Sequence, residues 1–222
     1  MLKTRIVSTL LDFKSRFVEM FGDPVTNPMG WETTKFSEVT SKIGSGATPM
    51  GGQENYIADG ISLIRSMNVY NGYFKYDELA HITDEQARHL ENVIVKEHDV
   101  LLNITGASIA RSCIVPFEIL PARVNQHVLI IRCESSRLNH RFANAILISD
   151  SYQRLLLSLG ESGGATRQAI TKQQIESFSI FLPPINLQNR FAEFVRQADK
   201  SKFAAQRQTK IATFLYNNIN GG

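Results

Sequence analysis

A heptad-like repeat near the end of the chain constrains the fold more than any other feature of the sequence. From Leu187 onward, alternating steps of four and three residues mark the seam of a coiled coil. A helix over residues 185–219 would be about 50 Å long, too long for its own domain alone to cover the seam. The seam positions are Leu187, Phe191, Phe194, Ala198, Ser201, Ala205, Gln208, Ala212, Leu215 and Ile219.

This seam predicts a partner for the helix. Large residues occupy its two ends and small residues its middle, so a second helix could approach closely there. Two partners fit: residues 1–21 of the same chain, or a second copy of the chain. A helix folded back onto its own domain is the remaining alternative. Residues 1–21 carry their own helical stripe, formed by Leu2, Ile6, Leu10, Phe13, Phe17 and Met20.

Residues 22–182 have the pattern of a mixed body of short strands and helices. Strand patterns cover residues 31–36, 60–74 with a turn at Asn71-Gly72, 98–116 with a turn at Gly106, 123–133, and 178–183. Helical patterns cover a short stretch capped by Ser37, a stretch behind the Thr83–Gln86 capping box, residues 139–159, and residues 170–175. No series of parallel strand–helix–strand units is visible.

The expected fold class is therefore α+β. We predict three parts: an N-terminal helix at residues 1–21, a β-rich domain with short helices at 22–182, and a long coiled-coil-type helix at 183–222. Gly22, Pro24, Pro28 and Gly30 separate the first two parts, and Pro183-Pro184 separates the last two.

Charge is distributed unevenly, although the net formal charge is only +3. Residues 22–100 carry a net charge of −6, whereas residues 101–172 and 183–222 each carry +4. A polyanionic partner would face the second half of the body and the terminal segments. The alternative is ordinary variation of surface charge.

Membrane, secretory and metal classes have no support in the sequence. No apolar run approaches the length of a membrane span, and the charged residues Asp12, Lys14 and Arg16 interrupt any signal-peptide core. Cys113 and Cys133 lack the spacing of metal ligands and are expected to be buried, reduced thiols. We expect a cytoplasmic protein without a metal, a disulfide or a membrane partner.

Catalytic motifs are also absent. The string Gly160-Glu161-Ser162-Gly163-Gly164 matches G-x-S-x-G, but a nucleophile elbow needs a strand before the serine, and here a helix is predicted. The string "LPPI" at 182–185 lacks the asparagine of an adenine methyltransferase motif. No G-x-G-x-x-G or phosphate-binding loop occurs. We therefore expect a binding protein with no catalytic residue and no cofactor of its own.

The order of several strings carries a resemblance. They are "MFGDPVTNPMGW", "GSGATP", "GISLIRSMNV", "HDVLLNITGASIARSCIV", "NQHVLIIR" and "GGATRQAITKQQIESFSIFLPPINLQNRFAEFV". Together they resemble one half of the DNA-specificity subunit of type I restriction-modification systems. The last string is the most specific, because it joins a glycine turn, a short helix, a strand ending in Pro-Pro and a long helix.

The resemblance implies a noncatalytic subunit that recognises double-stranded DNA. Such a subunit has two target-recognition domains held apart by two antiparallel helices. Methylating (M) subunits dock on it and use S-adenosylmethionine, and a restriction (R) subunit joins for cleavage. This chain has one recognition domain, one spacer helix and the tail of another. We hypothesise a half-subunit that forms a homodimer. The alternatives are half of a split or longer specificity subunit, or the recognition domain of a single-chain restriction-modification enzyme.

Glycine-containing loops and a hairpin supply the candidate DNA contacts, because they offer Arg, Lys, Asn, Gln, Ser and Thr side chains. The loops are residues 45–48, 105–111 and 163–168, and the hairpin lies near Asn71-Gly72. Ser162 is interpreted as a turn residue beside the third loop. The candidate contacts are Thr48, Arg65, Asn68, Lys75, Thr105, Ser108, Arg111, Thr166, Arg167, Gln168 and Lys172.

Overall fold

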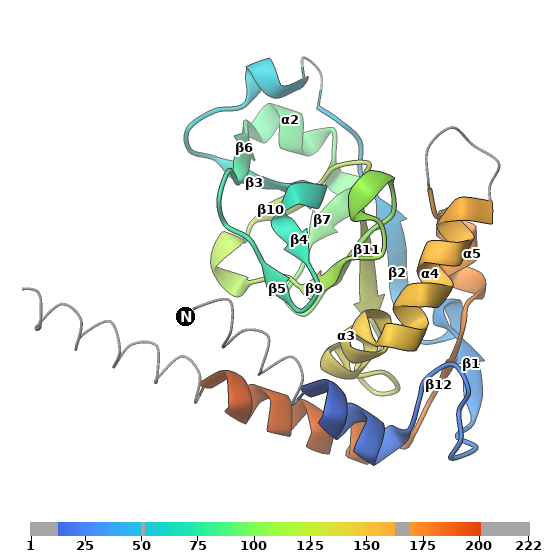
Figure 1. Cartoon of the computed structure of the whole chain (residues 1–222). Coiled ribbons are helices and arrows are strands. Elements are labelled where there is room, and N and C mark those ends of the chain that lie inside the picture. Colours follow the sequence, from blue (N-terminus) through green and yellow to red (C-terminus); the bar gives the residue numbers. More distant parts are fainter. Residues whose placement is uncertain (1–12, 50–51, 163–168, 201–222) are drawn as a thin grey trace, which may run out of the picture.

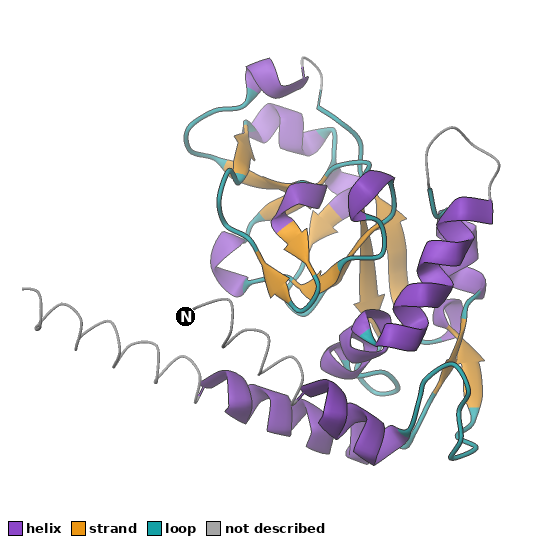
Figure 2. Cartoon of the chain, in the orientation of Figure 1, coloured by secondary structure: helices purple, strands orange, loops and turns teal. Residues whose placement is uncertain are grey.

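The structure is a computed structural model, and it describes residues 13–49, 52–162 and 169–200. A β-rich body stands on a pair of helical segments, residues 13–21 and 185–200, which lie side by side (Figure 1). Strands fill the middle of the body and helices flank it (Figure 2). The mixed α+β class is confirmed.

Two four-stranded sheets form the body. The first has the order β2-β11-β8-β9 and is antiparallel throughout, with β2 at Thr40–Ser45, β8 at Val100–Asn103, β9 at Ser112–Ile114 and β11 at Val128–Cys133. The second has the order β6-β3-β10-β7, with β3 at Ile61–Ile64, β6 at Ala80–Ile82, β7 at Ile94–Val95 and β10 at Ala122–Val124. In the second sheet β3 and β10 are parallel, and the other pairs are antiparallel.

Two small sheets and several short helices complete the body. Strand β1 (Thr33–Lys35) pairs with β12 (Ser179–Phe181), and β4 (Val69–Tyr70) pairs with β5 (Tyr73–Phe74). The α-helices of the body are α2 (Asp84–Arg88), α3 (His140–Ile148), α4 (Asp150–Ser162) and α5 (Lys172–Ser177). Single 3-10 turns occupy Phe36–Glu38, Gly52–Asn55, Ser66–Asn68, Glu91–Val93, Gly106–Ser108 and Phe117–Ile119.

Local signals in the sequence produce most of these elements. The Thr83–Gln86 capping box opens α2 as predicted, and Thr171 forms a second capping box with Gln174 at α5. The hairpin at Asn71-Gly72 is confirmed by the Tyr70–Tyr73 pair. The two strands around Gly106 are β8 and β9.

Two predicted helices need correction. Ser37 does not cap a helix, because it lies inside the 3-10 turn Phe36–Glu38, and β2 follows. The single helix predicted at 139–159 is divided at Ser149, which adopts an extended conformation. The Ser149 hydroxyl donates to the Ile146 carbonyl at 2.7 Å, and the Ser149 carbonyl accepts from the Gln153 amide at 2.9 Å. The serine therefore ends α3 and begins α4.

The first sheet separates two hydrophobic cores. Since side chains alternate across a strand, Leu102 and Leu129 face one core, and Leu101 and Ile130 face the other. The first core also contains the rings of Phe17, Phe21, Phe142, Phe181 and Phe191. The second lies between the two four-stranded sheets and includes Cys113. The body and the helical pair thus share the first core.

An ion pair between the buried Asp99 and the half-buried Arg132 connects the first sheet to β7 of the second sheet. The Asp99 carboxylate is 0% exposed and accepts two bonds from the Arg132 guanidinium, at 2.8 and 2.7 Å. It also accepts from the Lys96 amide at 2.7 Å, while Arg132 donates to the Ile94 carbonyl in β7. These bonds compensate for the removal of both charges from water.

Both cysteines are free thiols. Cys113 is buried as predicted, whereas Cys133 is only half-buried. Burial raises the pKa of each thiol to about 12. Within the described ranges, no three His, Cys, Asp or Glu side chains are placed to share a metal ion. None of the helices there combines the length and the hydropathy that a membrane-spanning segment needs.

Candidate nucleic-acid interface

The structure brings two of the three predicted loops together. The Gly46 amide donates to the Asn125 carbonyl at 3.1 Å, which places loop 45–48 against the connection between β10 and β11. Across that connection, the Ile104 amide donates to the His127 carbonyl at 3.0 Å. Loops 45–48 and 105–111 therefore lie on either side of residues 125–127.

The residues that directly follow the third loop lie beside the same place. Ala169 forms a β-bridge with Thr105, and the Ile170 amide donates to the Ile104 carbonyl at 2.8 Å. Thr166, Arg167 and Gln168 themselves lie outside the described residues. Ser162 is the last residue of α4, which corrects its interpretation as a turn residue. A helix precedes it, as predicted, so the strand that a nucleophile elbow needs is absent at this position.

A chain of side-chain hydrogen bonds joins the first two loops. The Thr48 hydroxyl donates to Gln126 Oε1 at 2.5 Å. Gln126 Nε2 lies 3.0 Å from His127 Nε2, and His127 Nδ1 lies 2.6 Å from the Thr105 hydroxyl. Gln126 and His127 are not among the candidate contacts predicted from the sequence. The string "NQHVLIIR" could have indicated them, since Gln126 and His127 directly precede a buried strand.

Gly46 permits this close approach. A Cβ atom at this position would lie 1.7 Å from the Val124 carbonyl oxygen and 3.2 Å from a methyl group of Val93. Any other residue would therefore push loop 45–48 away from β10. Gly106 has a different role: its φ of 70° is left-handed, and nothing lies within 4 Å of its hypothetical Cβ.

Hydrogen bonds to α4 and β8 also hold the 105–111 turn. Ala110 has a φ of 69°, which is unusual for a residue with a Cβ. Gln153 of α4 donates to the Ala110 carbonyl at 2.7 Å, and the Ala110 amide donates to the Asn103 carbonyl at 2.8 Å. Ser108 closes the turn by accepting the Arg111 amide at 3.3 Å. The strained turn therefore keeps a fixed shape.

A second group of candidate contacts surrounds the β4–β5 hairpin. The Arg111 guanidinium lies over the Tyr70 ring at 4.6 Å, and Tyr70 stacks on Tyr73 at 5.0 Å. Arg65 donates to the Glu78 carbonyl at 2.5 Å and lies 5.4 Å from the centre of the Tyr56 ring. These contacts orient two arginines at the surface.

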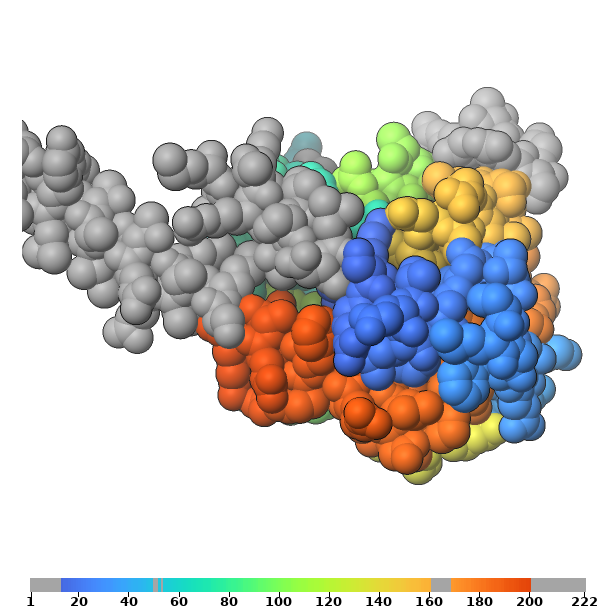
Figure 3. Space-filling view, turned by 60° about the horizontal axis from the view of Figure 1, so that its bottom comes forward, coloured from blue at the N-terminus to red at the C-terminus, as the bar shows by residue number. Residues whose placement is uncertain are grey.

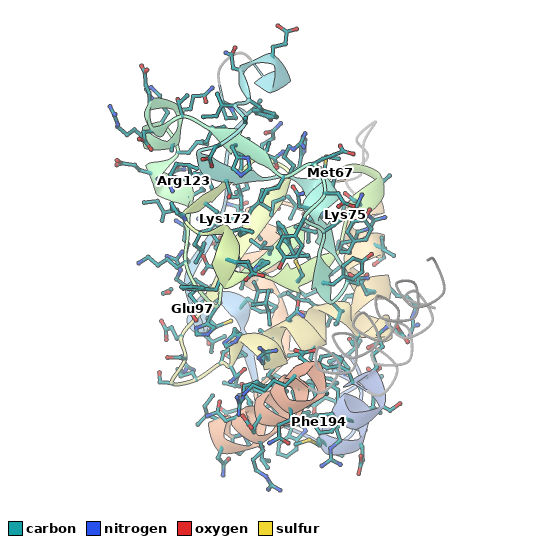
Figure 4. All side chains as sticks on the ribbon, turned by 90° about the vertical axis from the view of Figure 1, so that its left-hand side faces the viewer. Met67, Lys75, Glu97, Arg123, Lys172 and Phe194 are labelled. Carbon is teal, nitrogen blue, oxygen red and sulfur yellow. The ribbon has the colours of Figure 1, made fainter. Side chains whose placement is uncertain are left out.

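Lys75 and Asn68 of this group differ in exposure. Lys75 lies 3.7 Å from Asp77, next to Met67 and far from the helical pair that carries Phe194 (Figure 4). Asn68 is 0% exposed: its Oδ1 accepts the Arg65 amide and its Nδ2 donates to the Lys75 carbonyl, both at 3.0 Å. Its predicted DNA contact is therefore corrected, because the side chain is used to hold the hairpin.

Lys172 stands apart from both groups. It is the first residue of α5, and its ammonium group lies 3.4 Å from Glu176. A shallow polar cleft beside it is lined by Ser37, Lys42 and neighbouring residues of β2. The candidate contacts thus fall into three sets. The loop group contains Thr48, Thr105 and Ser108, the hairpin group contains Arg65, Lys75 and Arg111, and Lys172 stands alone.

The helical pair directly involves Phe191 of the predicted seam. Phe191 is fully buried, and its ring lies 5.2 Å from Phe13 and 5.5 Å from Phe17. The two segments lie directly against each other (Figure 3). Pairing with residues 1–21 of the same chain, one of the predicted alternatives, is therefore observed for residues 13–21.

The buried face of the C-terminal segment is rotated from the predicted seam. It consists of Gln188, Phe191, Ala192 and Val195. Leu187 and Ala198 are half-buried, whereas Phe194 is 37% exposed and carries the Arg16 guanidinium over its ring at 5.7 Å. Ala205, Ala212 and Leu215 lie outside the described residues.

A protein-family model matches most of the chain. Residues 28–213 match the model of the type I restriction modification DNA specificity domain. The chain belongs to this family. The match extends from the segment before β1 through the body and into the C-terminal helical segment.

Individual members of the specificity family are distant in sequence. The specificity subunit of the type I restriction enzyme EcoAI from Escherichia coli is 23% identical in an alignment of 203 positions that covers 86% of this chain and 33% of that subunit. This chain therefore spans about a third of the length of that curated relative.

Solved structures share the fold of this specificity domain. The HsdS subunit from Thermoanaerobacter tengcongensis aligns with a TM-score of 0.59 at 18% identity, covering 90% of this chain and 46% of that one. A chain from a study of assembly and conformational transition of the type I R-M system gives a TM-score of 0.61 at 19% identity, covering 96% and 49%. The S subunit from M. genitalium gives a TM-score of 0.59 at 9% identity, covering 97% and 55%.

Proposed function

We propose that this chain is the noncatalytic DNA-recognition module of a type I restriction-modification complex. The observation that carries the proposal is the family match over residues 28–213. The loop group adds support, since hydrogen bonds bring Thr48, Thr105 and Gln126 together through His127, and Ala169 forms a β-bridge with Thr105. Exposed amides and hydroxyls read base edges, and arginines hold phosphates.

The proposed assembly follows the three predicted parts of the chain. Residues 22–182 would read one half of a split double-stranded DNA target. Residues 1–21 and 183–222 would form the spacer, including a long coiled-coil helix that continues beyond residue 200. Methylating and restriction subunits would dock on this frame, and S-adenosylmethionine would be bound by the methylating subunit. The chain itself would contribute neither a cofactor nor a catalytic group.

A homodimer of half-subunits is the proposed route to a two-part target. The described helical pair leaves Val18 51% exposed and Phe194 37% exposed, so apolar surface remains for a further helix. Two-fold pairing would place two identical recognition bodies on inverted half-sites. Sedimentation of the full chain tests this: a dimer is expected, and Phe194→Asp should shift it toward monomer. A wild-type monomer at micromolar concentration would contradict the homodimer.

A second arrangement has a specific observation in its favour. The chain covers only 46–55% of the solved chains it resembles. In this arrangement the chain would be half of a split or longer specificity subunit, or the recognition domain of a single-chain restriction-modification enzyme. Co-purification with a different half-subunit, instead of with a tagged second copy, would favour this arrangement.

DNA binding is tested with a randomised duplex DNA, with and without a methylating subunit, over a salt series. Affinity should fall steeply as salt rises, because each phosphate contact releases counterions. Arg111→Gln should lower the slope by about 1, as expected for one lost phosphate contact. Arg88→Gln, an exposed arginine of α2 in the acidic first half of the body, is the matched control. Affinity independent of salt would contradict the proposal.

A further inference from the structure

We propose that Gln126 reads a base pair, and that Thr48 and His127 are positioning residues that hold its amide in one orientation. This inference rests on the proposed DNA-recognition function. It goes further by naming a base-reading side chain, the class of base it prefers, and the contacts that fix it.

The backbone beneath Gln126 is anchored on both sides. Asn125 is buried; its amide donates to the Ile64 carbonyl of β3 at 3.1 Å, and its carbonyl accepts the Gly46 amide at 3.1 Å. Its side-chain Oδ1 accepts the His127 amide at 3.0 Å. Gln126 is exposed between these anchored neighbours, at the turn that passes from β10 to β11. A side chain on so fixed a turn loses little backbone freedom when it binds a ligand.

Hydrogen-bond chemistry sets the direction of the contacts. An amide oxygen only accepts and an amide nitrogen only donates. The Thr48 hydroxyl therefore donates to Gln126 Oε1, and Gln126 Nε2 donates to the unprotonated Nε2 of His127. The proton of a neutral imidazole then lies on Nδ1, where it is donated to the Thr105 hydroxyl oxygen. In this arrangement each of the four side chains has a hydrogen-bond partner.

Two bonding positions of Gln126 remain unused in this arrangement. Oε1 has a second lone pair, and Nε2 has a second hydrogen. An acceptor and a donor on one planar amide match the N6 donor and N7 acceptor that adenine presents in the major groove. Guanine presents two acceptors there, so it would leave Oε1 without a donor. The chemistry therefore favours an A·T pair under Gln126.

The arrangement differs from a purely structural side-chain contact. Asn68 and Gln153 are also held by several hydrogen bonds, but Asn68 is buried and Gln153 is half-buried, and both are bonded to backbone groups. Gln126 is exposed, and its bonding partners are side chains of the two loops that flank it. A residue that served only to fix the fold would not need to present its free donor and acceptor to solvent.

The test is a selection from a randomised duplex DNA library by the full chain together with a methylating subunit. Wild type is expected to prefer adenine at one position of its selected motif. Gln126→Ala should lose the preference at that position alone, a change of roughly 5- to 150-fold in relative affinity, with the remaining positions and the salt dependence unchanged. Gln197→Ala, another exposed glutamine on the C-terminal helical segment, should leave the motif unchanged.

The positioning residues have their own readout. His127→Phe removes the acceptor for Gln126 Nε2, so the preference at the same position should weaken while overall DNA affinity is kept. Thr48→Val removes the donor to Gln126 Oε1, so the preference at this position should weaken in this variant as well. If Gln126→Ala selects the same motif as wild type, the inference is wrong and DNA recognition stands. If wild type selects no motif, the proposed function fails first.

Discussion

Replacing Gly46 with alanine should open the loop group. The new Cβ would lie 1.7 Å from the Val124 carbonyl oxygen, whereas real Cβ contacts do not fall below 3.0 Å. The loop and β10 would therefore have to separate by about 1.3 Å. Such a shift breaks the 3.1 Å bond from Gly46 to Asn125 and the 2.5 Å bond from Thr48 to Gln126.

The expected cost follows from these losses. Each hydrogen bond contributes about 0.5–1.5 kcal/mol net, and forced overpacking adds about 1–3 kcal/mol. With two bonds lost, Gly46→Ala should therefore lower the free energy of unfolding by about 2–6 kcal/mol. Because the displaced loop carries Thr48, the base preference assigned to Gln126 should weaken as well.

Equilibrium urea denaturation, followed by circular dichroism, measures this change. Gly44→Ala is the matched control, because Gly44 lies in β2 with no atom within 4 Å of its hypothetical Cβ and no left-handed φ. That variant should be neutral, or more stable by about 0.4–1 kcal/mol through the unfolded chain. Equal stability of the two alanine variants, with the DNA motif unchanged in both, would refute the close-approach argument.

Three further predictions concern the stability of the fold. Asp99→Asn should lower the free energy of unfolding by about 3 kcal/mol in urea denaturation, because it leaves a half-buried arginine without its counter-charge; a loss below about 1 kcal/mol would mean that the pair behaves as an exposed one. Phe191→Ala should cost about 3–5 kcal/mol by the same measurement, since it empties the shared core, whereas the exposed Phe194→Ala should cost much less. Burial, followed by the neighbouring His98 and Arg141 charges, lowers the pKa of His140 from 6.5 to about 4. The unfolded chain therefore binds this proton first, and stability should fall as the pH drops from about 6.5 to about 4, by at most about 1.4 kcal/mol per pH unit; thermal melts of wild type and His140→Gln that change identically with pH would contradict this.

Elements with a local cause are those that the sequence predicts well. The Thr83–Gln86 capping box and the Asn71-Gly72 turn depend on residues close together in the chain, and both are present. Ser149 shows the limit: a serine inside a helical pattern is tolerated, so the pattern does not reveal that its hydroxyl ends α3. The sequence also does not predict that residues 123–133 are divided between two sheets, because β10 and β11 pair with strands that are distant in sequence.

The candidate interface shows the same division. Glycine and small polar residues identify the three loops, but nothing local connects Thr48 to Gln126, which is 78 residues away. Asn68 looked like a surface amide, although backbone groups around the hairpin use its side chain. Phe194 has the correct seam spacing, yet the buried face is centred on Phe191 and Val195, because the body also packs on this segment.

The contact between residues 13–21 and 185–200 means that the chain enters and leaves the body at one edge. The body is therefore attached to the two helical segments at this edge. Substitutions in loops far from this attachment would leave the contact between the two helical segments unchanged, so the loop surface and the helical pair can vary independently.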